Sequence, residues 1–167
     1  MPPSPLPPPA DADDLARVRA QLGREPRDVV GVAHRCTCGA PDVLMTRPRL
    51  ADGTPFPTLY YLTCPRVTGL IGTLEGSGVM REWEAELATD PDLAAAYEAA
   101  HEAYLAQRAA VADVPEIDGI SAGGMPSRVK CLHVLAAHAL AAGPGVNPLG
   151  DRVLALLPDW GASGPCT

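Results

Sequence analysis

The sequence contains few aromatic residues and few positive charges. Aromatic side chains make up 4% of the 167 residues, so the core must be built mainly from leucine, valine and alanine in a chain that is 47% hydrophobic. Lys and Arg number 13 against 20 Asp and Glu, which gives a formal net charge of −7. Because sequence-independent nucleic-acid binding requires a basic face, we expect no nucleic-acid partner. The length is typical of one compact domain.

The sequence also lacks the hydrophobic run of ~18 residues that a membrane-spanning helix needs, so no membrane partner is expected. The N-terminal stretch MPPSPLPPPADADD has neither the basic region nor the apolar region of a secretory signal, which favours a cytoplasmic protein. Its prolines predict a disordered, extended arm over residues 1–11. We expect a single globular domain over residues 12–158 and a frayed tail over residues 159–167.

The hydrophobic pattern predicts strands first and helices afterwards. Strands are expected at residues 28–33, 42–46 and 58–63. Helices are expected at residues 11–23, 67–75, 80–88, 92–111 and 127–142, with a last short helix that ends before Pro158. This order predicts an α+β fold, in which a small antiparallel β-meander of about three strands packs against a helical body of four to six helices.

Five cysteines carry the clearest chemical signal. In a reducing compartment they indicate metal ligands, catalytic thiols or buried small side chains before disulfides. Cys36 and Cys38 lie in a glycine-bearing loop, where a C-x-C pair can close on one ion. Cys64 ends a predicted strand and Cys131 lies near the start of a predicted helix, so the four thiols can surround zinc or an iron–sulfur cluster. The alternative is that Cys64 and Cys131 are only buried core residues.

His133 forms a C-x-H pair with Cys131. Two such residues in a regular helix differ by about 200° and face opposite ways, so they can share one ion only if Cys131 lies before or at the first turn. His138, on the apolar stretch VLAAHALA, is interpreted as a core histidine.

A second set of polar residues could bind an anion or line a cleft. His101, Tyr104 and Arg108 share one face of the predicted helix 92–111. We interpret them first as an interface between helices and alternatively as a cleft wall, with His101 as acid–base and Arg108 holding an anion. Arg128 and Lys130 flank the expected start of the next helix, whose free amides can bind an anion. The sequence lacks a P-loop, a dinucleotide-binding glycine motif and a serine nucleophile elbow.

Several blocks of the sequence resemble a bacterial family known as domain of unknown function 501. They are DGTPFPTLYYLTCP (residues 52–65), GMP with RVKCLH (residues 124–133), the polar helix block around His101, and NPLG (residues 147–150). The resemblance extends over roughly residues 15–155. The family has no established activity that could be carried over to this chain.

The resemblance implies a set of metal ligands. The family pattern has a cysteine that matches Cys36, a cysteine or histidine that matches Cys64, and the pair that matches Cys131 and His133. Cys38 looks like an addition of this sequence. Exchange between cysteine and histidine is what a metal ligand tolerates. The resemblance therefore favours Cys36, Cys64 and Cys131, with His133, Cys38 or an exogenous group as the fourth ligand.

Three functions agree with these features. The first is a metal- or cluster-binding protein with a structural, sensing or electron-transfer role, and thiolate ligands suit zinc and iron–sulfur equally. The second is a metal-dependent enzyme with an open coordination position acting on a small anionic substrate, with His101, His133 or Glu75 as acid–base. The third is an acidic module that binds an unidentified protein partner, with the cysteines only in the core. Cys166 lies in the expected frayed tail, so its replacement is expected to have no effect.

Overall fold

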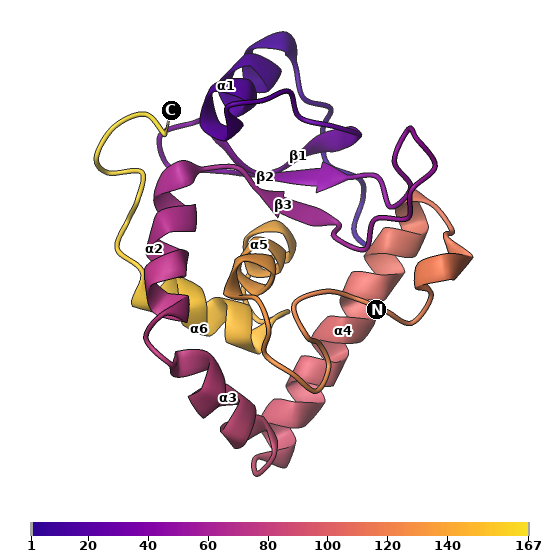
Figure 1. Cartoon of the computed structure of the whole chain (residues 1–167), viewed down its shortest axis with the longest axis vertical. Helices are drawn as coiled ribbons and strands as arrows, with labels where there is room; N and C mark the ends of the chain where they lie inside the picture. The colour runs from indigo at the N-terminus through magenta and orange to yellow at the C-terminus, as the bar shows by residue number, and fades with distance from the viewer. Residues whose placement is uncertain (1, 167) are drawn as a thin grey trace.

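A three-stranded sheet and the helices that follow it make up the fold. The computed structural model describes residues 2–166. The elements in chain order are α1 (Ala12–Leu22), β1 (Val29–Arg35), β2 (Pro41–Thr46), β3 (Tyr60–Leu62), α2 (Pro65–Glu75), α3 (Val79–Leu87), α4 (Pro91–Val111), the 3-10 helix η1 (Pro115–Ile117), α5 (Leu132–Ala142) and α6 (Pro148–Leu156). The strands are antiparallel in the order β1-β2-β3, so the predicted α+β class with a small meander is confirmed (Figure 1).

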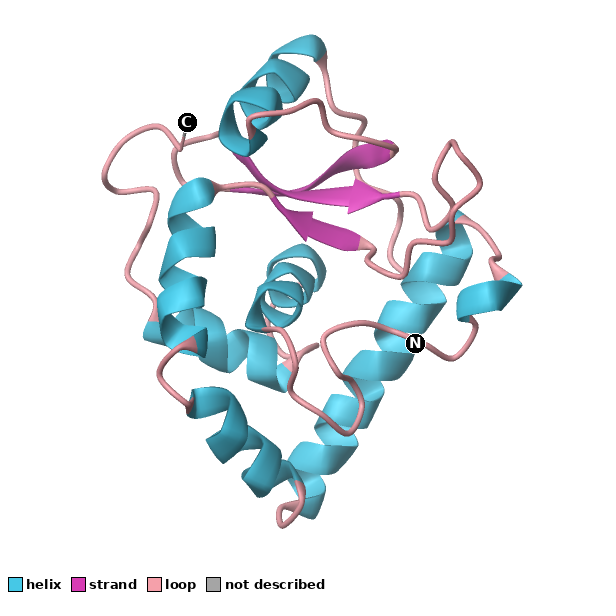
Figure 2. Ribbon diagram, in the orientation of Figure 1, coloured by secondary structure: helices cyan, strands magenta, loops and turns pink. Residues whose placement is uncertain are grey.

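The sheet separates two groups of buried side chains. Every residue of the central strand β2 is buried, because α1 covers one face of the sheet and the helical body covers the other (Figure 2). Successive side chains of a strand point to opposite faces. Leu44 accordingly packs with Val18 of α1, whereas Val43 and Met45 belong to the larger core shared with the helices. Among the described residues, no helix is both long enough and apolar enough to cross a membrane.

Short polar side chains define where helices begin. Asp11 and Asp14 form a reciprocal capping box at the start of α1, and Asp90 accepts backbone hydrogen bonds at the start of α4. Four of the six predicted α-helices begin and end within about two residues of their expected bounds, and the last one ends at Leu156, before Pro158 as expected. The exception is the helix expected from Ser127, which begins at Leu132 with Cys131 as its N-cap.

The late start of α5 has a local cause. Gly124 adopts a left-handed conformation, and a Cβ atom there would lie 2.6 Å from the carbonyl oxygen of Arg128. The amides of Arg128 and Lys130 donate to the carbonyls of Gly124 and Gly123. Residues 123–130 therefore form a tight loop, and this loop places Cys131 immediately before the helix.

Both terminal segments contact the rest of the fold, in contrast to the expectation of a solvated arm and a frayed tail. The amide of Val32 donates to the carbonyl of Pro8, and the side-chain amide of Gln107 donates to the carbonyl of Ser4, each at 3.0 Å. A Cβ atom on Gly31 would lie 2.4 Å from the Pro8 oxygen. Proline lacks an N–H but keeps its carbonyl, so a proline-rich segment can still accept hydrogen bonds beside an edge strand.

Candidate functional site

Three cysteine thiols meet at one edge of the sheet. The Sγ atom of Cys166 lies 3.3 Å from that of Cys36 and 3.4 Å from that of Cys38, and the three sulfur atoms all lie within 4.8 Å of one another. Cys36 and Cys166 are buried, and Cys38 is partly exposed. Two of these thiols come from the β1–β2 hairpin and the third from the C-terminal tail.

Cys64 adds a fourth thiol from the junction between β3 and α2. It is fully buried and is one of the neighbours that raise the pKa of Cys166, but it is not part of the group of three sulfur atoms within 4.8 Å of one another. β1 and β3 both pair antiparallel with β2, so they run in the same direction and end at the same edge of the sheet. Cys36, which follows β1, and Cys64, which follows β3, therefore lie at the same edge. We call Cys36, Cys38, Cys64 and Cys166 the thiol cluster.

The hairpin loop is built to turn tightly around this cluster. Gly39 has a φ of 88°, a left-handed conformation that favours glycine, and its amide donates to the Cys36 carbonyl at 2.8 Å. The Cys36 amide in turn donates to the Ala40 carbonyl at 2.9 Å. These bonds fold Cys36 and Cys38 toward one point, as a C-x-C pair on one ion requires.

Polar contacts hold the C-terminal tail against the thiol cluster. Arg66 of α2 donates to the carbonyl of Gly164 at 2.6 Å, and Thr37 of the hairpin donates to Asp159 at 3.1 Å. Gly161 passes so close that a Cβ atom would lie 2.7 Å from the Cys36 sulfur and 2.0 Å from the Thr37 hydroxyl. In Figure 1 the tail runs from α6 past α2 to the side of the sheet where the hairpin turns.

Two thiols of the cluster, Cys38 and Cys166, have pKa values that are shifted by their neighbours. Burial raises the pKa of Cys38, but the Ala40 backbone and the neighbouring thiols of Cys166 and Cys36 stabilise its thiolate and lower the pKa to about 7. Burial, followed by the contacts with the other three thiols, raises the pKa of Cys166. The neighbouring thiols thus stabilise the thiolate of Cys38.

A second group lies where α2 meets the start of α5. Cys131, His133 and Glu75 offer a sulfur, a ring nitrogen and a carboxylate oxygen within 4.8 Å of one another. Glu75 Oε1 accepts a hydrogen bond from the Leu132 amide at 2.8 Å and lies 3.2 Å from His133 Nδ1. Cys131 is the N-cap, so the condition under which it and His133 can face one point is met.

Both ring nitrogens of His133 face hydrogen-bond acceptors. Nε2 lies 3.0 Å from the Thr68 carbonyl oxygen, and Nδ1 faces Glu75. The contact with Cys131, followed by Thr68 and Glu75, raises the pKa of His133 to about 9 against the effect of burial. Burial raises the pKa of Cys131, but the contacts with His133 and the Val134 amide outweigh it and lower that pKa overall.

The structure therefore divides the ligand set expected from the sequence. Cys36, Cys38 and Cys64 come together, whereas Cys131 and His133 lie in the second group. α2 separates the two: Cys64 precedes its first residue and Glu75 is its last, so these two positions are about 16 Å apart along the helix axis. Metal binding by either group stays a prediction.

Sequence reasoning missed Cys166. It was expected to lie in a frayed tail and to be replaceable, but it is buried and its sulfur lies 3.3 Å from that of Cys36 and 3.4 Å from that of Cys38. The residue type alone could have indicated its role, because any further cysteine in the sequence is a candidate for the fourth ligand of a site with three predicted cysteine ligands.

The polar stripe on α4 ties the helix to its neighbours. His101 Nδ1 lies 2.8 Å from the Ser121 hydroxyl, and the Tyr104 hydroxyl accepts a bond from the Leu59 amide at 2.6 Å. Arg108 donates to the carbonyls of Pro57 and Ile117. His101, Tyr104 and Arg108 are all buried, which favours the interface interpretation over the cleft.

The expected anion site at residues 128–130 contains a carboxylate of the chain itself. Glu84 of α3 accepts from Arg128 Nε at 2.9 Å and from the Val129 amide at 3.0 Å. Lys130 is exposed. The Arg128 cation is thus already paired within the fold.

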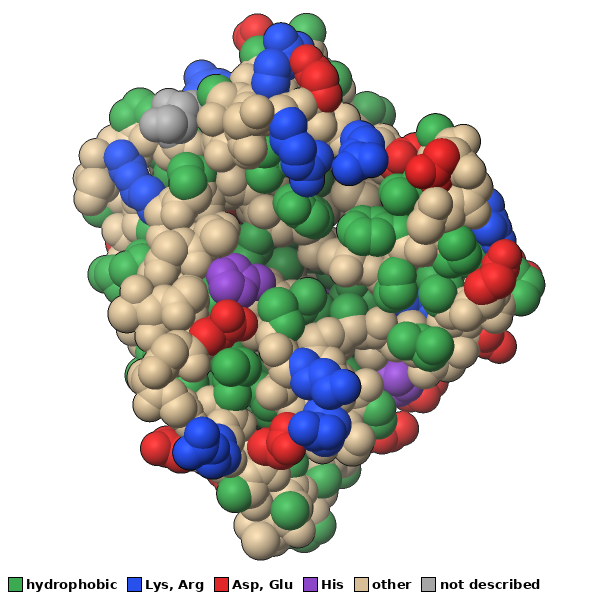
Figure 3. Space-filling model, in the orientation of Figure 1, with side chains coloured by type: hydrophobic (Ala, Val, Ile, Leu, Met, Phe, Trp, Pro, Cys, Tyr) green, Lys and Arg blue, Asp and Glu red, His purple; other side chains and the backbone are tan. Residues whose placement is uncertain are grey.

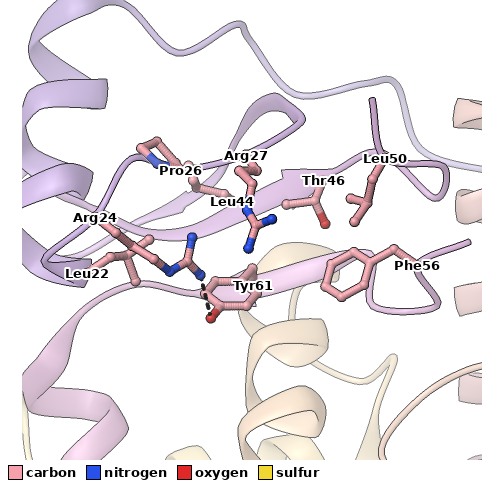
Figure 4. A pocket seen from close by; sticks show the side chains of 9 residues that line it. All are labelled: Leu22, Arg24, Pro26, Arg27, Leu44, Thr46, Leu50, Phe56 and Tyr61. Atoms are coloured by element: carbon pink, nitrogen blue, oxygen red, sulfur yellow. Dashed lines mark hydrogen bonds between the residues drawn. The ribbon is translucent and has the colours of Figure 1, made fainter. Parts of the chain in front are cut away.

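A small cavity lies away from both cysteine groups. It has a volume of about 220 Å³, and its lining includes Arg24, Arg27, Phe56 and Tyr61 (Figure 4). Arg24 donates to the Tyr61 hydroxyl at 3.2 Å, and its guanidinium lies over the Tyr61 ring. On the face shown in Figure 3, hydrophobic side chains gather across the middle while basic and acidic groups are interspersed around them.

Comparisons with known proteins identify the family without assigning a function. No curated protein and no solved structure matches the chain. The model of one family, described as a protein of unknown function (DUF501), matches residues 32–155. The matched segment contains every residue of both cysteine groups except Cys166. It covers well over half of the sequence, so the chain belongs to the DUF501 family.

Proposed function

We propose that this protein binds one zinc ion through Cys36, Cys38, Cys64 and Cys166. The observation that carries this proposal is the convergence of the Cys36, Cys38 and Cys166 sulfur atoms within 4.8 Å of one another. Cys64, which is buried and raises the pKa of Cys166, is the fourth ligand of the proposed shell. Four thiolates are a complete shell for zinc, which is bound tetrahedrally in structural sites. Such a site has no open position for substrate, so its role is to hold the fold together.

The spacing of the sulfur atoms favours a single ion over an iron–sulfur cluster. A tetrahedral zinc ion with bonds of about 2.3 Å places its sulfur ligands about 3.8 Å apart. The distances from Cys166 to Cys36 and Cys38, 3.3 and 3.4 Å, need only a small expansion to reach this value. In a cubane cluster each thiolate binds a different iron, which requires the thiols to lie farther apart.

The same site would explain why the tail adopts a defined path. Cys166 is 130 residues from Cys36, so a shared ion closes a long loop and joins the C-terminus to the first hairpin. Binding requires deprotonated thiols and occurs in the folded chain, so the free energy of binding adds to the free energy of unfolding.

Metal analysis of the full-length chain tests this proposal. We expect one zinc per chain by native mass spectrometry, and a loss of zinc together with a lower melting temperature in Cys166→Ser. Cys131→Ser is the matched control, since that thiol lies outside the thiol cluster, and it should keep the ion.

Alkylation provides a test that does not depend on folded variants. With zinc bound, the partly exposed thiol of Cys38 should be protected from iodoacetamide and should become reactive when a chelator removes the ion. The proposal would be contradicted if the purified chain held no metal and its melting temperature did not change on addition of zinc. Bound iron with an absorption band in the visible range would also contradict it.

A further inference from the structure

The second cysteine group has features that the zinc proposal does not use. Cys131, His133 and Glu75 are all partly exposed, in contrast to the buried thiols Cys36, Cys64 and Cys166. The side chains of His133 and Glu75 are 27% and 24% exposed. A small molecule in solution can therefore approach this group.

Hydrogen bonding specifies the charge of the His133 ring. A backbone carbonyl only accepts, so the nitrogen that faces Thr68 must carry a proton. An ionised carboxylate also only accepts, so the nitrogen that faces Glu75 must carry one as well. The ring is then an imidazolium, and its raised pKa of about 9 agrees with this assignment. A ring nitrogen that donates a proton in this way is not free to coordinate a metal.

The thiol of Cys131 lies where a negative charge is stabilised. It precedes the first residue of α5, so it faces the positive end of the helix dipole. The imidazolium of His133 and the Val134 amide both lower its pKa. Glu75 opposes this effect. Tyr104 of α4 also interacts with Cys131, and it is neutral because burial raises its pKa to about 12.

We propose that Cys131 is the nucleophile of a second site, which accepts activated acyl compounds such as esters or thioesters, with His133 as proton donor and Glu75 as the positioning residue. A thiol beside a histidine that a third group orients is the arrangement of covalent thiol catalysis. The site is independent of the zinc site and uses none of its ligands.

The reaction conserves charge and atoms. The Cys131 thiolate attacks the carbonyl carbon, a carbon–sulfur bond forms, and the bond to the leaving group breaks. The leaving thiol or alcohol takes the proton from Nδ1 of the His133 imidazolium, and the hydrogen bond from Nδ1 to Glu75 is lost in this step. The products are a thioester on Cys131, a neutral histidine and the free leaving group. Water then attacks the thioester carbonyl and gives a proton to His133, the carbon–sulfur bond breaks, and the carboxylic acid leaves a Cys131 thiolate and a His133 imidazolium. The backbone amide of His133, in the first turn of α5, is the candidate to stabilise the oxyanion.

The test uses the full-length, zinc-supplemented chain with p-nitrophenyl acetate, and peptide mass mapping reads each cysteine separately. We expect a burst of about one equivalent of p-nitrophenolate per chain and an acetyl group on the peptide that contains Cys131. Cys131→Ser should abolish the burst. His133→Gln can still donate to Thr68 but carries no charge, and should slow acylation at pH 6.5 by about tenfold or more, because the thiolate fraction falls.

The pH profile distinguishes roles in the site. Acylation should rise as the Cys131 thiol ionises and fall as His133 loses its proton. Glu75→Gln should move the descending limb to lower pH, because the carboxylate no longer stabilises the imidazolium. A residue with only a structural role would not shift this limb.

Three results would overturn this inference, and none depends on whether zinc binds the thiol cluster. The first is that the rate of alkylation of Cys131 by iodoacetamide in the wild-type chain depends on pH with an ordinary thiol pKa near 8.5. The second is acetylation spread over all five cysteines at equal rates. The third is zinc retained by a Cys36→Ser, Cys38→Ser variant and released by His133→Gln, which would make this group a metal site.

Discussion

At the scale of single residues, His138 shows how burial determines charge. It is 1% exposed, its ring stacks on Tyr60, and the edge of the Tyr104 ring packs against it. The side-chain nitrogen of Asn147 lies 3.1 Å from Nδ1 and donates to it, which suits a neutral ring. Burial lowers the pKa of His138 to about 4. The interpretation of this residue as a core histidine is thereby confirmed.

This burial predicts a pH dependence of stability. The unfolded chain takes up a proton near pH 6.5 whereas the folded chain takes it up near 4, so stability present above 6.5 is lost as the pH falls toward 4. The difference in the free energy of unfolding between wild type and His138→Gln should narrow by on the order of 3 kcal/mol over this range. Chemical denaturation at pH 7 and pH 4 measures it, and a difference that does not change with pH would contradict the prediction.

At the scale of elements, α4 depends on its cap. Its 21 residues begin after Asp90, whose carboxylate accepts from the amides of Asp92 and Leu93 at 3.0 and 3.1 Å. Pro91 occupies the first turn, where its missing N–H costs nothing. The helix carries the buried residues that contact β3, η1 and the loop before α5. Its position therefore affects both the sheet and the second cysteine group.

Removal of the α4 cap should destabilise the whole domain. We expect Asp90→Ala to lower the free energy of unfolding by about 1 kcal/mol, because two amides lose their acceptor. For a chain of this size that corresponds to a fall of about 2–4 °C in melting temperature. Asp113→Ala, an exposed acid just beyond the C-terminal end of α4, is the control and should be neutral or slightly stabilising. Equal losses in both variants would show that the cap has no specific effect.

At the scale of the whole molecule, the C-terminal tail packs against the β1–β2 hairpin and α2. Gly161 lets the tail approach the hairpin closely because it has no side chain. A Cβ atom at this position would lie 2.7 Å from the Cys36 sulfur and 3.2 Å from the Cys38 amide nitrogen. The Thr37 hydroxyl can move away, but the sulfur and the backbone atom are held by the hairpin. The close approach therefore couples the packing of the tail to the geometry of the thiol cluster.

Gly161→Ala should release the tail without unfolding the domain. We expect faster hydrogen exchange over residues 159–166 and a lower zinc affinity, with little change in the exchange of α4. Gly69→Ala is the matched control, because no atom lies within 4 Å of a Cβ placed there. Unchanged exchange in the Gly161 variant would show that the tail does not pack on the hairpin in solution.

Local patterns were enough to predict most elements and part of each site. Strand alternation, helix periodicity and acidic N-caps depend on neighbours along the chain, so the meander and five of the six α-helices could be predicted. The shared direction of β1 and β3 also brings Cys36 and Cys64 to one edge, as a meander requires. The start of α5 could not be predicted, because the loop at Gly123 and Gly124 is stabilised by backbone hydrogen bonds that helix propensity does not describe.

The sequence by itself determined the chemical inventory: five thiols, the Cys131–His133 pair and the order of strands and helices. Only the tertiary structure decided how this inventory is divided. α2 spans the distance between Cys64 and Glu75. It therefore separates the two cysteine groups, whose residues the sequence had placed in one set of metal ligands. The path of the tail brings Cys166 to the hairpin across 130 residues, and the proline-rich arm lies along β1. Such contacts depend on how distant segments pack, which no local pattern encodes.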